Sequence, residues 1–172
     1  MIRYVGLDPR FGGVKDITPD ESAALAAVGL GRVIVYQPRQ SFVPGAGDSG
    51  DGAAAVALWQ ATEAGMPAGR PIYFAVDGDT SQLDSLMWAE INAFFAAAGD
   101  RLGVDRVGVY GGIHTIERLR AAGLATWYWQ TFAWSAGQWA DGLHLRQFDN
   151  NNPLCGGTVD YDRAMTRDYG QW

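Results

Sequence analysis

The sequence predicts an α/β fold built on a parallel sheet or barrel, because short apolar segments of β character alternate with helical patterns. The length of 172 residues predicts a single domain over residues 1–172, large enough to bury a core. Seven segments rich in β-branched and aromatic residues are the expected strands: residues 3–6, 32–37, 71–77, 106–110, 125–130, 143–148 and 158–161.

The expected helices lie between these strands. Thr18 stands three residues before Glu21, with Pro19 at the first helical position, and Gly29 supplies a stop signal. Apolar residues at helical spacing predict three further helices, over residues 53–64, 83–98 and 115–122.

The second half of the chain departs from this alternation. The last three strands are too close in sequence for full crossover helices, so the fold is expected to be degenerate there. Seven strands are also one fewer than a closed eight-stranded barrel requires. Residues 44–52 read as a flexible loop with no lysine, which argues against a phosphate-binding loop.

Composition excludes several classes of function. The net charge of −6 argues against a protein that tracks nucleic-acid phosphates. Cys155 is the only cysteine, and His114 and His144 have no metal-ligand spacing, so neither a metal nor a cofactor is predicted. Seven Trp residues are many for this length. They fit either a groove that stacks sugars or a Trp-rich core.

The chain shows no targeting or membrane signal. Residues 1–5 lack the apolar core of a signal peptide, and no stretch is long and apolar enough for a membrane span. Export by the general secretory route is therefore not expected.

Two carboxylates close the strand expected over residues 71–77. Side chains alternate along a strand, so Asp77 and Asp79 are predicted to point the same way. Two like charges held close together disfavour joint ionisation, which suits one of them to hold a proton. The alternative is a loop Asp that caps the next helix beside a solvated Asp.

Polar and aromatic residues recur at the other strand ends. In a barrel, functional groups collect where strands end and loops begin. The resulting set is acidic, aromatic and rich in amides, which suits a neutral polyhydroxylated ligand and not phosphate or acyl chemistry. Its members are Tyr36, Asp77, Asp79, Tyr110, Trp129, Gln130, Gln147, Asp160 and Asp162. A further tryptophan, Trp127 or Trp134, is expected in the same groove.

Several segments resemble one family in the order expected for it: residues 70–79, 107–112, 125–133, 145–148, 158–162 and 169–172. The chain resembles the glycoside-hydrolase-like domain of unknown function found in actinobacteria and their phages, a relative of the family-25 lysozymes. The resemblance covers nearly the whole chain. It implies a TIM-barrel-like fold with a carboxylate site that acts on the glycan of peptidoglycan.

The resemblance also implies roles for individual residues. Asp79 would be the proton donor, with one methylene less than the Glu of family-25 lysozymes, and Asp77 and Asp160 would be its catalytic partners. From their position at strand ends, and not from the resemblance, the remaining residues are expected to bind substrate: Tyr36, Tyr110, Trp129, Gln130, Gln147 and Asp162. The family begins with an Asp-bearing strand, whereas this chain starts at what resembles the second strand, over residues 3–6.

Two functions follow as hypotheses. The first is a peptidoglycan-directed glycosidase of the lysozyme or endolysin type. The second is a carbohydrate-binding or structural module of a phage tail, virion or cell-wall protein. The expected location is the host cytoplasm before release, or a virion, with action at the cell wall. A homo-oligomer or a virion partner could complete the barrel, because an open sheet leaves edges to pair.

Overall fold

The computed structural model of the protein describes residues 1–7 and 15–172. In this part of the chain, seven strands form one curled sheet, a half-barrel, with the order β1-β2-β3-β4-β5-β6-β7. Strands β1 to β6 are parallel and β7 is antiparallel to β6. The strands are β1 (Ile2–Val5), β2 (Val33–Tyr36), β3 (Ile72–Ala75), β4 (Val107–Gly111), β5 (Trp127–Thr131), β6 (Leu145–Leu154) and β7 (Gly157–Ala164).

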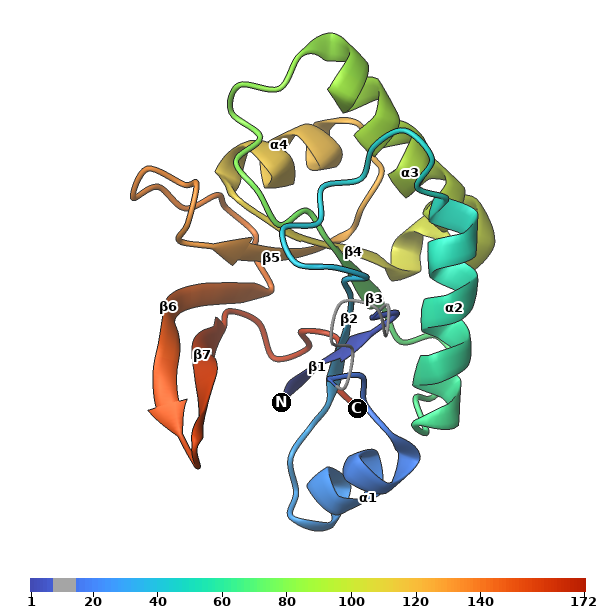
Figure 1. Cartoon of the computed structure of the whole chain (residues 1–172), viewed down its shortest axis with the longest axis vertical. Helices are drawn as coiled ribbons and strands as arrows, with labels where there is room; N and C mark the ends of the chain where they lie inside the picture. The colour runs from blue at the N-terminus through green and yellow to red at the C-terminus, as the bar shows by residue number, and fades with distance from the viewer. Residues whose placement is uncertain (8–14) are drawn as a thin grey trace.

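Four α-helices connect the first five strands, and α2, α3 and α4 lie against one face of the sheet, which we call the outer face (Figure 1). They are α1 (Pro19–Ala27), α2 (Gly50–Glu63), α3 (Ser85–Leu102) and α4 (Ile113–Ala121), and a short 3₁₀ turn, η2 (Val104–Arg106), precedes β4. Within residues 1–7 and 15–172, none of these helices is long and apolar enough to cross a membrane.

The predicted strands and helices are confirmed, with shifted boundaries. Thr18 Oγ1 accepts a hydrogen bond from the Glu21 backbone N–H, as a capping residue should. Helix α2 begins at Gly50, inside the segment predicted as a loop, because Ser49 caps it by accepting from the Gly52 N–H. Strand β3 ends at Ala75 and not at Asp77, so the alternation of side chains does not extend to Asp77 and Asp79.

The degenerate second half is also confirmed. No helix follows β5 in the described residues, and β6 reaches its place in the sheet through the loop over residues 132–144. Strands β6 and β7 then form a long hairpin with irregular register between Gln147 and Asn152. Figure 1 shows this hairpin extending away from the helices.

Aromatic packing on the outer face holds α3 against the sheet. The Phe74 ring on β3 lies 5.9 Å from Phe94 and 6.2 Å from Phe95, both edge to face. Phe42, in the loop after β2, meets Phe94 at 5.8 Å. Edge-to-face contacts at these separations are favourable beyond the apolar area that they bury.

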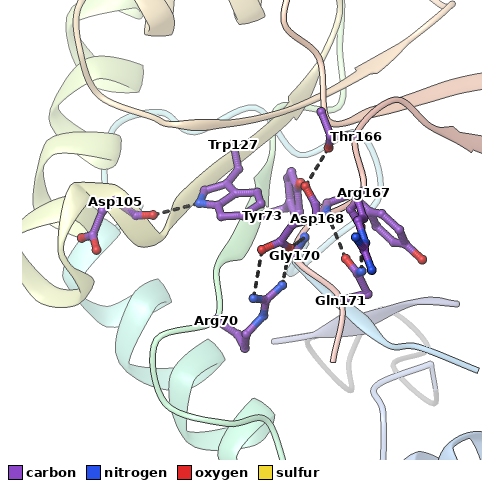
Figure 2. A network of polar contacts seen from close by, with 10 residues as sticks. Arg70, Tyr73, Asp105, Trp127, Thr166, Arg167, Asp168, Gly170 and Gln171 are labelled. Carbon is purple, nitrogen blue, oxygen red and sulfur yellow. Dashed lines mark hydrogen bonds and ion pairs between the residues drawn. The ribbon is translucent and has the colours of Figure 1, made fainter.

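The C-terminal segment, residues 165–172, returns to the N-terminal ends of β2 and β3. Backbone bonds of 2.9 and 3.1 Å join Arg32 and Trp172 in both directions, and the Tyr73 hydroxyl donates to the Tyr169 carbonyl. Figure 2 shows the Arg70 guanidinium paired with Asp168 in this network. The segment therefore covers the end of the sheet opposite to the carboxyl ends of the strands.

We expect Gly170→Ala to destabilise the fold through this segment. Gly170 has φ +94°, and an added Cβ would lie 2.8 Å from Pro71 Cγ. The backbone strain and the clash together should lower the free energy of unfolding by about 2 kcal/mol or more. Gly29→Ala is the matched control for urea unfolding, since Gly29 has φ +77° but open space around it. Equal losses in both variants would contradict the packing role of Gly170.

Candidate functional site

The inner face of the sheet, opposite the helices, carries a chain of hydrogen-bonded polar groups. Gln147 on β6 is buried and connects two of them. Its Oε1 accepts from the Tyr110 hydroxyl at 2.8 Å, and its Nε2 donates to Asp160 Oδ2 at 2.8 Å. Asp160 Oδ1 also accepts from the Asn151 N–H. The Gln147 amide thus holds the exposed carboxylate of Asp160 on β7 in a fixed position relative to the Tyr110 ring on β4.

A second carboxylate of β7 lies beside the same rings. Trp129 Nε1 donates to Asp162 Oδ1 at 2.6 Å, and the Trp129 ring packs on Tyr110 with centroids 4.4 Å apart. Burial, reinforced by the negative charge of Asp160, raises the pKa of Asp162 to about 6. The hydrogen bond from Trp129 opposes this rise. Asp162 therefore changes its charge in the mildly acidic range.

Asp77 approaches this cluster from the loop after β3. Its Oδ2 accepts from Gln37 Nε2 at 2.9 Å and from the Ser41 N–H at 3.0 Å. Burial is the largest cause that raises the pKa of Asp77, and the charge of Asp160 adds to it. The two hydrogen bonds act in the opposite direction. Asp77 is thus a half-buried carboxyl for which protonation is favoured relative to a solvated Asp.

Tyr4 on β1 is the residue that sequence reasoning missed. Burial raises the pKa of its hydroxyl, and the charges of Asp160, Asp77 and Asp162 add to this effect. Its ring therefore lies within electrostatic reach of all three carboxylates. The sequence signal for Tyr4 is an aromatic residue with a polar hydroxyl inside a strand. The predicted site residues were instead those at the ends of strands.

Asp79 does not join this group. It is exposed, and its Oδ1 accepts from the Ser81 N–H at 2.9 Å, which lowers the pKa of Asp79. The expectation that Asp77 and Asp79 face one cleft with Asp160 relied on strand alternation, and β3 has already ended at Ala75. Asp79 stays ionised and caps a turn, while the cap of the next helix, α3, is Asp84 and not Asp77 or Asp79.

Three other predicted residues lie away from the carboxylates. Tyr36 packs among Phe42 and Phe74, on the side that faces the helices. Gln130 is fully buried and holds the loop after β5 by donating to Ser135 Oγ and to the Gln138 carbonyl. Both side chains fall on the outer face because residues next to each other in a strand alternate.

Trp127 also lies elsewhere. It donates to the Asp105 carbonyl near the C-terminal segment, at the N-terminal ends of the strands (Figure 2).

The structure thus brings together six predicted residues and Tyr4, which we call the acidic cluster: Tyr4, Asp77, Tyr110, Trp129, Gln147, Asp160 and Asp162. A cavity of about 300 Å³ lies elsewhere, between residues 45–50 and α3, and is lined by none of these residues. The half-buried carboxyls of Asp77 and Asp162 lie near the exposed carboxyl of Asp160. Carboxyls in such different environments are suited to acid–base chemistry on a sugar.

Comparison with known proteins places this chain in a family. The family model of the Rv2525c-like glycoside hydrolase-like domain matches residues 1–166. The chain belongs to this family. The resemblance noted from the sequence is therefore confirmed, and the family is one of hydrolase-like domains.

The relatives agree with this assignment. A Mycobacterium tuberculosis protein named "Putative peptidoglycan hydrolase Rv2525c" is 29% identical over 187 residues, which cover 99% of this chain and 74% of the relative. The crystal structure of Rv2525c with L-tartrate has a TM-score of 0.87 at 28% identity, covering 99% of this chain and 87% of that chain.

The modular autolysin LytC of Streptococcus pneumoniae has a TM-score of 0.60 at 16% identity. The match covers 94% of this chain and 39% of that chain. At this identity the likeness concerns the fold alone.

One expectation from the sequence is corrected by these relatives. The absence of an apolar segment near residue 1 suggested the host cytoplasm or a virion as the location. Rv2525c is described as Tat-secreted, which points to export in this family. The sequence feature that marks a Tat signal is a pair of arginines, which the expectation from residues 1–5 did not consider.

Proposed function

We propose that this protein is a glycosidase that cleaves the glycan of peptidoglycan outside the cytoplasm. One observation carries the proposal: two carboxyls in different environments, Asp77 half-buried and Asp160 exposed, lie close enough for the charge of Asp160 to raise the pKa of Asp77. Glycosidases use such a pair, one carboxyl as the acid and the other as the nucleophile or base. The family and the name of Rv2525c support the choice of substrate.

In the proposed mechanism, Asp77 donates the proton to the leaving glycosidic oxygen. Asp160 acts as the nucleophile or base, held in place by Gln147 and the Asn151 N–H. The Trp129 and Tyr110 rings are buried, so in this mechanism they position Asp162 and Gln147 from beneath and do not stack on the sugar. Protonated Asp162 would donate a hydrogen bond to a sugar hydroxyl.

The family resemblance assigns the donor role to Asp79 instead. Its exposure and lowered pKa do not favour this assignment, because a general acid must hold its proton near the working pH. Substitution of each carboxyl by its amide distinguishes these two assignments of the acid.

A second candidate function is a carbohydrate-binding module without turnover. It is favoured by Asp79, since the position that the family resemblance gives to the acid carries an ionised, turn-capping carboxylate. Such a module would bind glycan through the polar groups of the acidic cluster without cleaving it.

Incubation of the full chain with purified peptidoglycan at pH 4–8 tests both functions. Release of new reducing ends supports the glycosidase. Co-sedimentation with peptidoglycan without new reducing ends supports the binding module. Failure of both in a folded sample contradicts the proposal altogether.

We also propose that the sheet is an incomplete version of the TIM-barrel-like fold, to which six successive parallel strands and the likeness to LytC lend support. Within residues 1–7 and 15–172, the edge of β1 away from β2 pairs only through the isolated bridge between Tyr4 and Asp16, so a strand from a second copy or an assembly partner could pair there. Light scattering should then detect a dimer or larger assembly. A monomer at high concentration would count against a second copy.

A further inference from the structure

The β6–β7 hairpin has an outer face that is distinct from the face of the acidic cluster. Its inner face carries Gln147, Asp160 and Asp162, so residues next to these in the strands point outward. Arg146 and Arg163 are such residues, and they form a directly opposite pair across the two strands. No α-helix covers this part of the sheet in the described chain, and Figure 1 shows the hairpin standing apart from α1 to α4.

Aromatic rings surround the two guanidinium groups. Arg146 lies over the Trp139 ring at 4.9 Å, and Arg163 lies over Phe148 at 5.5 Å. Phe148 in turn stacks on Tyr161, with centroids 6.4 Å apart and an interplanar angle of 26°. Phe148 and Tyr161 remain 47% and 45% exposed, which leaves ring surface free for a ligand. Trp139, Arg146, Phe148 and Arg163 line a shallow pocket of about 160 Å³.

The charge pattern of this face needs an explanation. Like charges directly opposite each other on neighbouring strands destabilise a sheet. Four arginines elsewhere, Arg3, Arg39, Arg70 and Arg101, pair with carboxylates. Neither Arg146 nor Arg163 has an ion pair or donates a side-chain hydrogen bond within residues 1–7 and 15–172. The same holds for Arg118 on α4, but Arg146 and Arg163 differ from it in lying directly opposite each other. In a protein of net charge −6, two unpaired guanidiniums side by side indicate an anionic partner.

We propose that Arg146, Arg163, Trp139, Phe148 and Tyr161 form a binding surface for a carboxylate-bearing polysaccharide. A guanidinium that stacks on a ring keeps the N–H groups of its edge free, and these match the planar oxygens of a carboxylate in bidentate pairing. The exposed Phe148 and Tyr161 rings provide apolar platforms for the faces of sugar rings. This surface is separate from the acidic cluster and does not depend on whether that cluster cleaves glycan.

Calorimetric titration with oligogalacturonate, which has one carboxylate on each sugar, tests this surface. We expect the full chain to bind it, and the methyl ester of the same oligosaccharide to bind at least about tenfold more weakly, because esterification removes the charge. The Arg146→Gln/Arg163→Gln variant should lose at least about tenfold in affinity. Arg118→Gln is the matched control: it removes one exposed guanidinium that lies over Trp88 at 4.3 Å, on another face of the molecule.

Thermal unfolding distinguishes loss of the surface from loss of the fold. Relief of the repulsion between Arg146 and Arg163 should leave the midpoint of the double variant equal to or above that of the unaltered protein. If the double variant has a lower unfolding midpoint than the unaltered protein, the affinity of the single Arg163→Gln variant for oligogalacturonate is the test instead. Arg163 is exposed, so its replacement should not disturb the fold. The proposal is overturned if the folded variant binds oligogalacturonate as tightly as the unaltered protein does, or if the methyl ester binds equally. It is also overturned if inorganic polyphosphate binds this face and oligogalacturonate does not.

Discussion

The Asp77→Asn variant is expected to lose about 10²–10⁴-fold in the rate of peptidoglycan cleavage while keeping its fold. An asparagine accepts the same hydrogen bonds from Gln37 and the Ser41 N–H, but it cannot deliver a proton to the leaving oxygen. The initial rate of reducing-end release, measured with saturating peptidoglycan, gives the loss directly. Binding measured by co-sedimentation should change little.

Asp79→Asn is the matched control for this variant, since it makes the same chemical change two residues away. Asp79 is exposed and ionised, so its replacement should reduce the rate by less than about tenfold if Asp77 is the acid. The reverse pattern, a large loss in Asp79→Asn and a small one in Asp77→Asn, would assign the proton donor as the family resemblance does. Equal rates in all three proteins would contradict a catalytic role for either carboxyl.

The Asp162→Asn variant is expected to be more stable than the unaltered protein at pH 7. Burial raises the pKa of Asp162 from its ordinary value of 3.8 to about 6, so the native state pays to ionise this group at neutral pH. Asparagine keeps the hydrogen bond from Trp129 without the charge. Two units of pKa correspond to about 3 kcal/mol, so a gain of about 1–3 kcal/mol in the free energy of unfolding is expected.

The sign of the pH dependence follows from the same carboxyl. Between pH 3.8 and about 6 the native state binds the proton and the unfolded state does not, so this group lowers stability as the pH rises through that window. The gain in Asp162→Asn should therefore be present at pH 7 and shrink toward pH 4. Urea unfolding at both pH values measures it, with Asp79→Asn as an exposed control that shows no gain. A gain of the same size at pH 4 and pH 7 would contradict a raised pKa at Asp162.

The sequence predicted the elements of the fold well because each has a local signal. The apolar runs marked all seven strands, and Thr18, Pro19 and Gly29 marked the ends of α1. The start of α2 was missed because a stretch rich in glycine and aspartate hid the cap at Ser49. The sequence did not predict that residues 165–172 cover the N-terminal ends of β2 and β3. This arrangement depends on contacts between segments that are distant in the sequence.

The candidate site was predictable only in part. Tyr110, Trp129, Gln147 and Asp162 are in strands, where alternation decides the face, and the structure brings them together. Gln130 is next to Trp129 in the same strand, so only one of the two could face the carboxylates. Asp79 follows the strand, and there a backbone hydrogen bond from Ser81 sets the direction of its side chain, which no periodicity predicts.

Mass spectrometry of the fragments released from purified peptidoglycan tests the central claim most directly. If the acidic cluster hydrolyses a glycosidic bond, each cleavage adds one water and leaves a sugar with a free reducing end, with its peptide still attached. These fragments should be absent from digests with Asp77→Asn. Free peptides without new reducing sugars, or fragments that form equally with Asp77→Asn, would contradict the assignment of this protein as a glycosidase that uses Asp77.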